Sequence, residues 1–372
     1  MARNRNIEVL RAFAIIYMLL YHYASSITGL VKSYKGSLFI ESLGQFALIG
    51  FFVLSGFGLY LSFERLETSG KPIQFLPFIK RRLRSLLPQY YLCIGIVLLL
   101  TTGIGYLSIS HVFHIIQSLF LVQNFAPGNG INGVTWTIAV LFQLYLISIP
   151  LYYLVKKYGW RTWVIGVIIT VCLKKSIAMY IAINELDALY YVITSIRIPF
   201  TTIDLILAGM CAAKICQEIP AKMLLVLRKP QMCIFCISLV LLYHYIFIKG
   251  TLILLGGGLY GSKWVNCVWQ SVIGGYLSII CIMLYYLPFT YTSKLGSGVQ
   301  FIAKYEYGIY LWHMLLMGNF MSSQPDWYAW LQANFPIILL TQTSHIKNGV
   351  CTLKNQYFSA QNSNQAAFCP YS

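Results

Sequence analysis

Long apolar runs dominate the chain, and short polar or basic segments separate them. Most of these runs have about the 17 to 25 residues that an α-helix needs to cross a bilayer core ~30 Å thick. We expect membrane spans at about residues 7–24, 39–62, 88–107, 134–155, 162–183, 199–215, 231–248, 269–287 and 299–319. A tenth span begins near Phe335, and two lysines, Lys174 and Lys175, interrupt the fifth. The pattern predicts an all-α, polytopic transmembrane bundle of about ten helices.

The pattern changes abruptly at Thr341, where an apolar run becomes polar. No polar stretch is long enough for a second soluble domain, so we expect residues 1–340 to form a single transmembrane domain. We interpret residues 341–372 as a polar tail in which the last span is aberrant or truncated. Our hypothesis is that the native reading frame is lost there.

Composition supports a lipid environment. The chain is 58% hydrophobic and 10% charged, whereas a soluble domain usually carries about 25% charged residues. Such a chain has too few charges for a water-facing surface, so membrane lipid surrounds most of the exterior. The cysteines are scattered, most of them inside apolar runs, and we expect no metal site.

The net charge of +17 reflects topology rather than nucleic-acid binding, because the basic residues lie in short loops between apolar runs. With the N-terminus in the cytoplasm, cytoplasmic segments hold 17 lysines and arginines and external segments hold seven. The positive-inside rule therefore predicts a cytoplasmic N-terminus. The basic start of the chain, followed by an apolar run without a small-residue cleavage site, indicates an uncleaved first span.

Two ionisable residues, Arg11 and His22, lie in the first span. Eleven residues make almost three helical turns, so both side chains face the same way, separated by ~16 Å along the axis. An ionisable group in a membrane helix normally faces the interior of the bundle. Imidazole could accept a proton from a hydroxyl group, and a guanidinium suits a phosphate or carbonyl oxygen. The alternative is that Arg11 extends to the inner surface and His22 bonds a neighbouring helix.

A basic run, KRRLR at residues 80–84, precedes Pro88, which we expect to open the third span. The run either anchors the chain at an anionic membrane surface or binds a phosphorylated cytoplasmic cofactor. In the second span, the pair Ser55 and Gly56 allows the close approach of a helix or of a ligand.

Five fragments together resemble the acyltransferase-3 family of membrane proteins, which modify bacterial surface polysaccharides, lipopolysaccharide or peptidoglycan. In chain order they are IEVLRAFAIIYMLLYHY, GQFALIGFFVLSGFGLYL, FIKRRLRSLLPQYY, GVTWTIAVLFQLYLISIPLYY and YEYGIYLWH. The most specific elements are the Arg-x10-His of the first span and the Arg-x-x-Arg formed by Arg81 and Arg84. The resemblance implies that His22 is the catalytic base and that Arg11, Arg81 and Arg84 bind or position the donor.

The sequence departs from the family in one motif. Many relatives carry acidic residues after the tryptophan of the fourth span, whereas Trp136 is followed by none, and Gln143 and Tyr145 are the polar groups that remain. His313, in the late YLWH motif, is either catalytic or a structural histidine. Asp204 is an acid deep within a span, which pairs with Arg197 or with a basic residue of the site, or is a buried polar anchor.

The function we expect is O-acyl transfer in the bacterial cytoplasmic membrane. The resemblance implies acetyl-CoA or another acyl-CoA as donor substrate, no tightly bound cofactor, and a surface polysaccharide or lipid-linked saccharide as acceptor. One alternative is a transporter or flippase of lipid-linked glycans, although no internal repeat is visible. Another is a membrane sensor or scaffold that has lost activity.

Overall fold

In the computed structural model, the described residues are 5–26, 34–102, 109–125, 131–183, 197–229, 231–253, 264–287 and 294–323. These residues form helices and turns but no strand, which confirms the all-α prediction. The long helices are α1 (Arg5–Ser26), α2 (Tyr34–Thr68), α3 (Phe75–Thr102), α5 (Trp136–Tyr158), α6 (Trp160–Ile183), α8 (Ile203–Glu218), α10 (Gln231–Ile253), α11 (Trp264–Tyr286) and α12 (Lys294–Ser323). The short ones are α4 (Ile109–Leu119), α9 (Ala221–Leu227), η2 (Gln123–Phe125) and η3 (Pro199–Thr201).

Six of the described helices, α1, α2, α5, α6, α10 and α11, are long and apolar enough to cross a membrane. Large apolar side chains on outward faces are exposed, such as Leu99 of α3, Ile168 of α6 and Leu241 of α10. A soluble protein would bury such groups, whereas in a bilayer they face lipid. The chain is therefore a polytopic membrane protein. The total of ten spans remains a prediction, and the tenth, near Phe335, lies outside the described residues.

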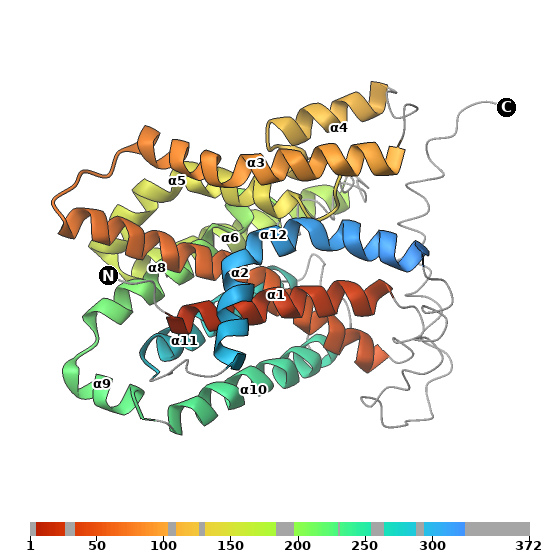
Figure 1. Cartoon of the computed structure of the whole chain (residues 1–372). Coiled ribbons are helices and arrows are strands. Elements are labelled where there is room, and N and C mark those ends of the chain that lie inside the picture. Colours follow the sequence, from red (N-terminus) through yellow and green to blue (C-terminus); the bar gives the residue numbers. More distant parts are fainter. Residues whose placement is uncertain are drawn as a thin grey trace.

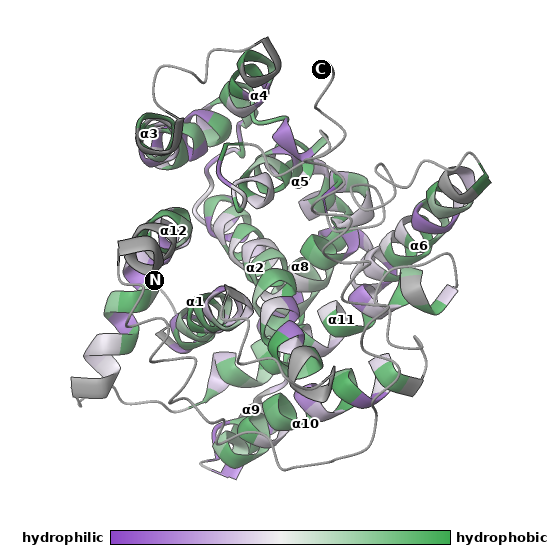
Figure 2. Cartoon of the chain, turned by 90° about the vertical axis from the view of Figure 1, so that its right-hand side faces the viewer, coloured by the Kyte–Doolittle hydropathy of each residue, from purple (hydrophilic) through white to green (hydrophobic). Residues whose placement is uncertain are grey.

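The centre of the bundle is a close crossing of α2 and α8 (Figures 1 and 2). A Cβ atom added to Gly56 would lie 2.1 Å from the carbonyl oxygen of Ile206, and one added to Gly209 would lie 1.9 Å from that of Val53. The two backbones touch because both positions lack a side chain, as is typical of helix pairs in membranes. The expectation that Gly56 permits close approach of a helix is confirmed.

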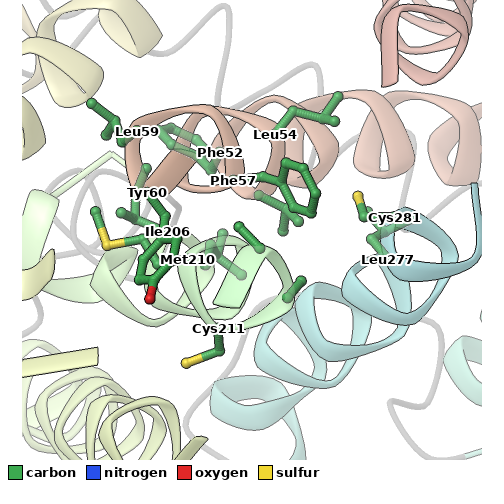
Figure 3. Close-up of a cluster of buried hydrophobic side chains, with 14 of the residues drawn as sticks. Phe52, Leu54, Phe57, Leu59, Tyr60, Ile206, Met210, Cys211, Leu277 and Cys281 are labelled. Atoms are coloured by element: carbon green, nitrogen blue, oxygen red, sulfur yellow. The ribbon is translucent and has the colours of Figure 1, made fainter. Parts of the chain in front are cut away.

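Apolar side chains from three helices fill the space around this crossing (Figure 3). The cluster joins α2 with α8 and α11, and its labelled members are Phe52, Leu54, Phe57, Leu59, Tyr60, Ile206, Met210, Cys211, Leu277 and Cys281. The opposite side of the bundle is built by α1 and α12, which pack against each other. Helix α1 also packs against α2, and α12 packs against α3.

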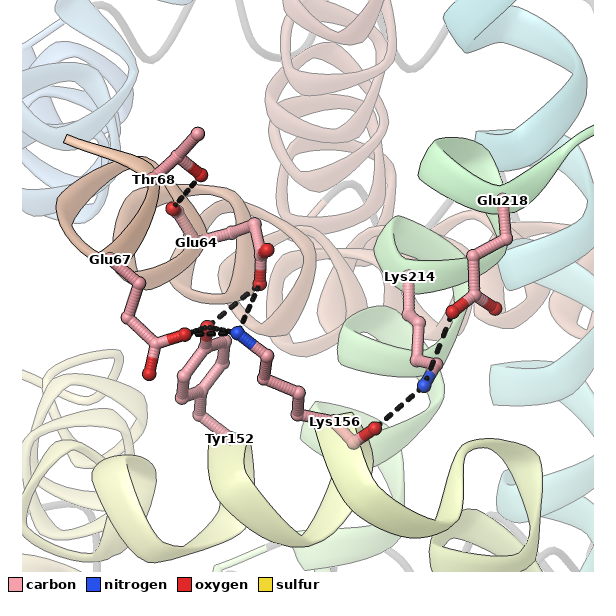
Figure 4. A network of polar contacts seen from close by, with 7 residues as sticks. All are labelled: Glu64, Glu67, Thr68, Tyr152, Lys156, Lys214 and Glu218. Carbon is pink, nitrogen blue, oxygen red and sulfur yellow. Dashed lines mark hydrogen bonds and ion pairs between the residues drawn. The ribbon is translucent and has the colours of Figure 1, made fainter. Parts of the chain in front are cut away.

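A polar network ties α2, α5 and α8 together at the end that we expect to be cytoplasmic (Figure 4). The Tyr152 hydroxyl lies 2.7 Å from a carboxylate oxygen of Glu64 and 2.8 Å from one of Glu67, so the two carboxylates share its single donor hydrogen. Lys156 forms ion pairs with both carboxylates, and Lys214 donates to the backbone carbonyl of Lys156 at 2.7 Å. The network holds the ends of α2, α5 and α8 together on this side of the bundle.

Two boundary predictions need correction or refinement. The third helix begins at Phe75, so the prediction that Pro88 opens it is wrong, and Pro88 lies inside the helix. The basic run at residues 80–84 is consequently helical. The fifth span is uninterrupted, because the buried Lys174 donates a hydrogen bond to Gln270 and Lys175 lies over the ring of Trp264.

Candidate active site

A cavity of about 490 Å³ lies between α1, α2, α3, α5 and α12. Three helices each contribute an arginine to its wall, and we call it the arginine cavity. Its polar lining includes Glu8, Arg11, Ser55, Ser62, Arg65, Arg82, Ser85, Thr137, Tyr145, Glu306 and Tyr310. Its volume is within the range of small-molecule sites in proteins.

Helices α1 and α12 bring two polar pairs together. Arg11 forms an ion pair with Glu306, a contact between residues 295 positions apart in the chain. Further along both helices, the imidazole rings of His22 and His313 lie with their centroids 5.0 Å apart. Arg11 and His22 thus share one face of α1, as their spacing predicts, and this face meets α12.

The two pairs differ in their relation to the arginine cavity. Arg11 and Glu306 line it, whereas His22 and His313 are absent from its wall. Tyr310 connects the two regions, because it lines the cavity and its ring lies 5.7 Å from that of His313. Its hydroxyl donates to the backbone oxygen of Val134 at 2.8 Å and lies 2.6 Å from the hydroxyl of Thr137. Tyr310 is therefore a neighbour of both the cavity and His313.

His313 is held in one orientation. Its Nδ1 lies 2.7 Å from the backbone oxygen of Tyr310, and a carbonyl can only accept, so Nδ1 carries the hydrogen. Nε2 of the neutral ring then bears no proton and can act as an acceptor beside His22. Two imidazoles at this distance can pass a proton or fix each other's tautomer.

The basic run of α3 divides between two faces. Arg81 and Arg84 are exposed and, with Lys80, border a shallow hollow of about 530 Å³ outside the arginine cavity. Arg82 points the other way, into the cavity, with its guanidinium 5.0 Å from the centre of the Tyr145 ring. Residues 81 and 84 share a helix face, and residue 82 lies about 100° away from residue 81.

Ser55 and Tyr145 line the arginine cavity, whereas Trp136 and Gln143 do not. Trp136 lies under the guanidinium of Arg197, at 5.1 Å. Gln143 donates to the backbone oxygen of Leu121 and to Asn124, both at 2.8 Å, and so holds the segment before α5 in place.

Asp204 lies outside the arginine cavity, in a buried polar cluster between α6, α8 and α11. It is 1% exposed and neighbours Lys174, which is 2% exposed. Lys174 also donates to Gln270. The sequence analysis offered Arg197 or a basic residue of the site as the partner of Asp204. The charged neighbour in the structure is Lys174, which the sequence analysis did not connect with Asp204.

Arg65, Arg82 and Glu306 are among the residues of the cavity wall that sequence reasoning missed. Glu306 lies within the YEYGIYLWH fragment, three turns after the start of α12. Its distance of seven residues from His313 places it on the same face of the helix, and this spacing could have identified it.

A model of the acyltransferase domain family matches residues 4–341 of the chain. The match covers α1 to α12, including every element that lines the arginine cavity. No curated protein and no solved structure gives a significant match.

Proposed function

Because this chain belongs to the acyltransferase-3 family, we propose that it moves an acetyl group from acetyl-CoA to a hydroxyl of a cell-surface polysaccharide or its lipid-linked precursor. Membrane acyltransferase activity follows from the family. The donor, the acceptor and the location in a bacterial cytoplasmic membrane are our proposal.

The proposal rests on the two polar pairs that α1 and α12 hold along their common interface. Arg11 and Glu306 line a cavity that includes residues at the end we expect to be cytoplasmic, and His22 and His313 lie beyond Tyr310 toward the other end. An anionic donor and a hydroxyl acceptor can thus approach the histidines from opposite sides. Arg81 and Arg84, exposed on α3, would make the first electrostatic contact with the donor.

In this mechanism His22 accepts the proton of the acceptor hydroxyl while the oxygen attacks the thioester carbonyl carbon. A carbon–oxygen bond forms, the carbon–sulfur bond breaks, and the proton passes from His22 to the departing thiolate. His313 positions the His22 ring and can share its proton. The arm of the donor would carry the thioester past Tyr310 to His22, while the nucleotide of the donor stays at the cytoplasmic end.

Arg11 acts at a different point of the donor. Eleven residues of helix separate it from His22 by ~16 Å, which is too far for a contact with the reacting carbonyl. The Glu306 carboxylate holds its guanidinium at the cavity wall. Arg11 therefore suits a polar group on the arm of the donor rather than the oxyanion.

His22→Ala tests the proposal. A positioned general base contributes about 10²- to 10⁴-fold to a rate. The rate of acetylation by the variant should therefore fall at least ~100-fold, while the variant still inserts into the membrane. The measurement is mass spectrometry of surface glycans from a deletion strain complemented with each variant. Wild-type acetylation by His22→Ala would refute the role of His22, and loss of the entire polymer on deletion would support a flippase instead.

A further inference from the structure

The arginine cavity is elongated along α2, and its two ends differ in chemistry. Its wall on α2 runs from Leu48 to Arg65, a distance of about 26 Å at 1.5 Å per residue. Arg11 lies beside Gly58, in the half nearer Arg65. The opposite end is lined by apolar side chains and two hydroxyl groups, and its residues are Leu48, Phe51, Thr137, Ile138 and Tyr310.

Two aromatic rings meet across this second end of the cavity. Phe51 of α2 and Tyr310 of α12 both line the cavity, with their ring centroids 5.8 Å apart and their planes inclined by 69°. This edge-to-face arrangement is a favourable one for two aromatic rings. The contact joins α2 to α12, and we call these two residues the ring pair.

Both members of the ring pair are held in place. The Tyr310 hydroxyl is bonded to Thr137 and to the backbone of Val134, as described above. Phe51 packs against the apolar cluster that contains Ile138 and Tyr310. The space beside the ring pair is therefore limited by side chains that their neighbours support, and a larger ligand cannot widen it without disturbing this packing.

The ring pair lies next to the proposed catalytic histidines. The Tyr310 ring is 5.7 Å from that of His313, which is 5.0 Å from that of His22. In the mechanism proposed above, the thioester passes Tyr310 to reach His22. The acyl group is attached to this thioester, so it has to pass the ring pair as well.

We infer that Phe51 determines the length of the acyl chain that the protein transfers, because its ring narrows the passage beside Tyr310. An acetyl group passes, and an acyl chain with additional methylene groups is excluded. The inference rests on the proposed function, and it names the residue that selects among acyl donors. One methylene group changes the specificity of an apolar pocket by about 10- to 200-fold.

A competition between two donors tests the inference. Membranes that contain the full-length protein receive equal concentrations of acetyl-CoA and butyryl-CoA, with polysaccharide from the deletion strain as acceptor. Mass spectrometry of the two esters on the polysaccharide gives the ratio of the two kcat/KM values. This ratio is independent of the amount of folded protein, so a variant that is produced poorly is still informative.

The wild-type protein should prefer acetyl over butyryl by at least about tenfold. Phe51→Ala removes the ring and should lower this preference tenfold or more, with butyryl esters becoming a major product. Phe51→Leu leaves a smaller side chain at the same place and should lower the preference by a smaller factor. It also keeps the test valid if Phe51→Ala does not fold.

Phe63→Leu is the matched control. Phe63 is a phenylalanine of the same helix that is absent from the cavity wall, and its ring lies 5.0 Å from that of Phe78 and 5.4 Å from that of Tyr152. This variant should keep the wild-type ratio of acetyl to butyryl esters, although it loses packing in α2.

Three results would overturn the inference: a wild-type protein without preference for acetyl, an unchanged ratio in both Phe51 variants, or an equal change of the ratio in Phe63→Leu and Phe51→Leu. A wild-type protein that transfers neither acyl group would instead refute the proposed function, and with it the inference.

Discussion

The crossing of α2 and α8 predicts that alanine at Gly209 or Gly56 destabilises the bundle. The added Cβ would lie 1.9 Å or 2.1 Å from a backbone oxygen of the facing helix. An ordinary contact needs about 3.4 Å, so the helices must separate by about 1.5 Å or 1.3 Å. The obstacle is backbone rather than a flexible side chain, and it cannot move aside alone.

Overpacking of a core typically costs about 1 to 3 kcal/mol. We expect Gly209→Ala to reach or exceed the upper value of ~3 kcal/mol, because the separation disturbs the whole apolar cluster around the crossing. At about 2 °C per kcal/mol for a large domain, the melting temperature should fall by about 6 °C or more. The assay is thermal unfolding of the purified protein in detergent, followed by tryptophan fluorescence.

Gly95→Ala and Gly250→Ala are matched controls. Both glycines lie inside helices, and a Cβ added at either would meet nothing within 4 Å. Alanine is the better helix former by up to about 1 kcal/mol, so these variants should melt at or slightly above the wild-type temperature. If Gly209→Ala melted like Gly95→Ala, the backbone contact between α2 and α8 would be disproved.

Two further predictions concern charged residues inside the bundle. Glu306→Gln should raise the KM for acetyl-CoA about tenfold in a transfer assay, because Arg11 loses the anion that holds it; an unchanged KM would contradict this role. Lys174→Met should lower the free energy of unfolding by about 1 to 3 kcal/mol, because the buried side-chain oxygen of Gln270 loses its hydrogen-bond donor. The double variant with Gln270→Leu should recover much of this loss in thermal unfolding, and an equally low melting temperature would argue against this hydrogen bond.

The sequence was sufficient for the all-α membrane fold and for the shared face of Arg11 and His22, because both follow from helical periodicity. Periodicity shows which face a residue occupies but not which helix covers that face. The partners of Arg11 and Lys174 are 295 and 96 positions away in the chain. No local pattern identifies such partners.

The error at Pro88 explains why the sequence did not separate the arginines of the basic run from one another. With a helix start at residue 88, the run at residues 80–84 reads as a loop in which all the basic residues are equivalent. Because α3 begins at Phe75, the run makes more than one helical turn and its arginines separate onto different faces. Proline tolerates such a position when neighbouring helices stabilise the interruption of the backbone hydrogen bonds.

The anchored Tyr310 ring has a consequence for water. Its hydroxyl is bonded to α5 residue Thr137 and to the backbone of Val134 in the turn before α5, so this segment holds the ring that α12 carries. If the proposed donor occupies the cavity, its thioester approaches this ring, and the ring should limit the access of water to it. Hydrolysis of the thioester in the absence of an acceptor should then be slow.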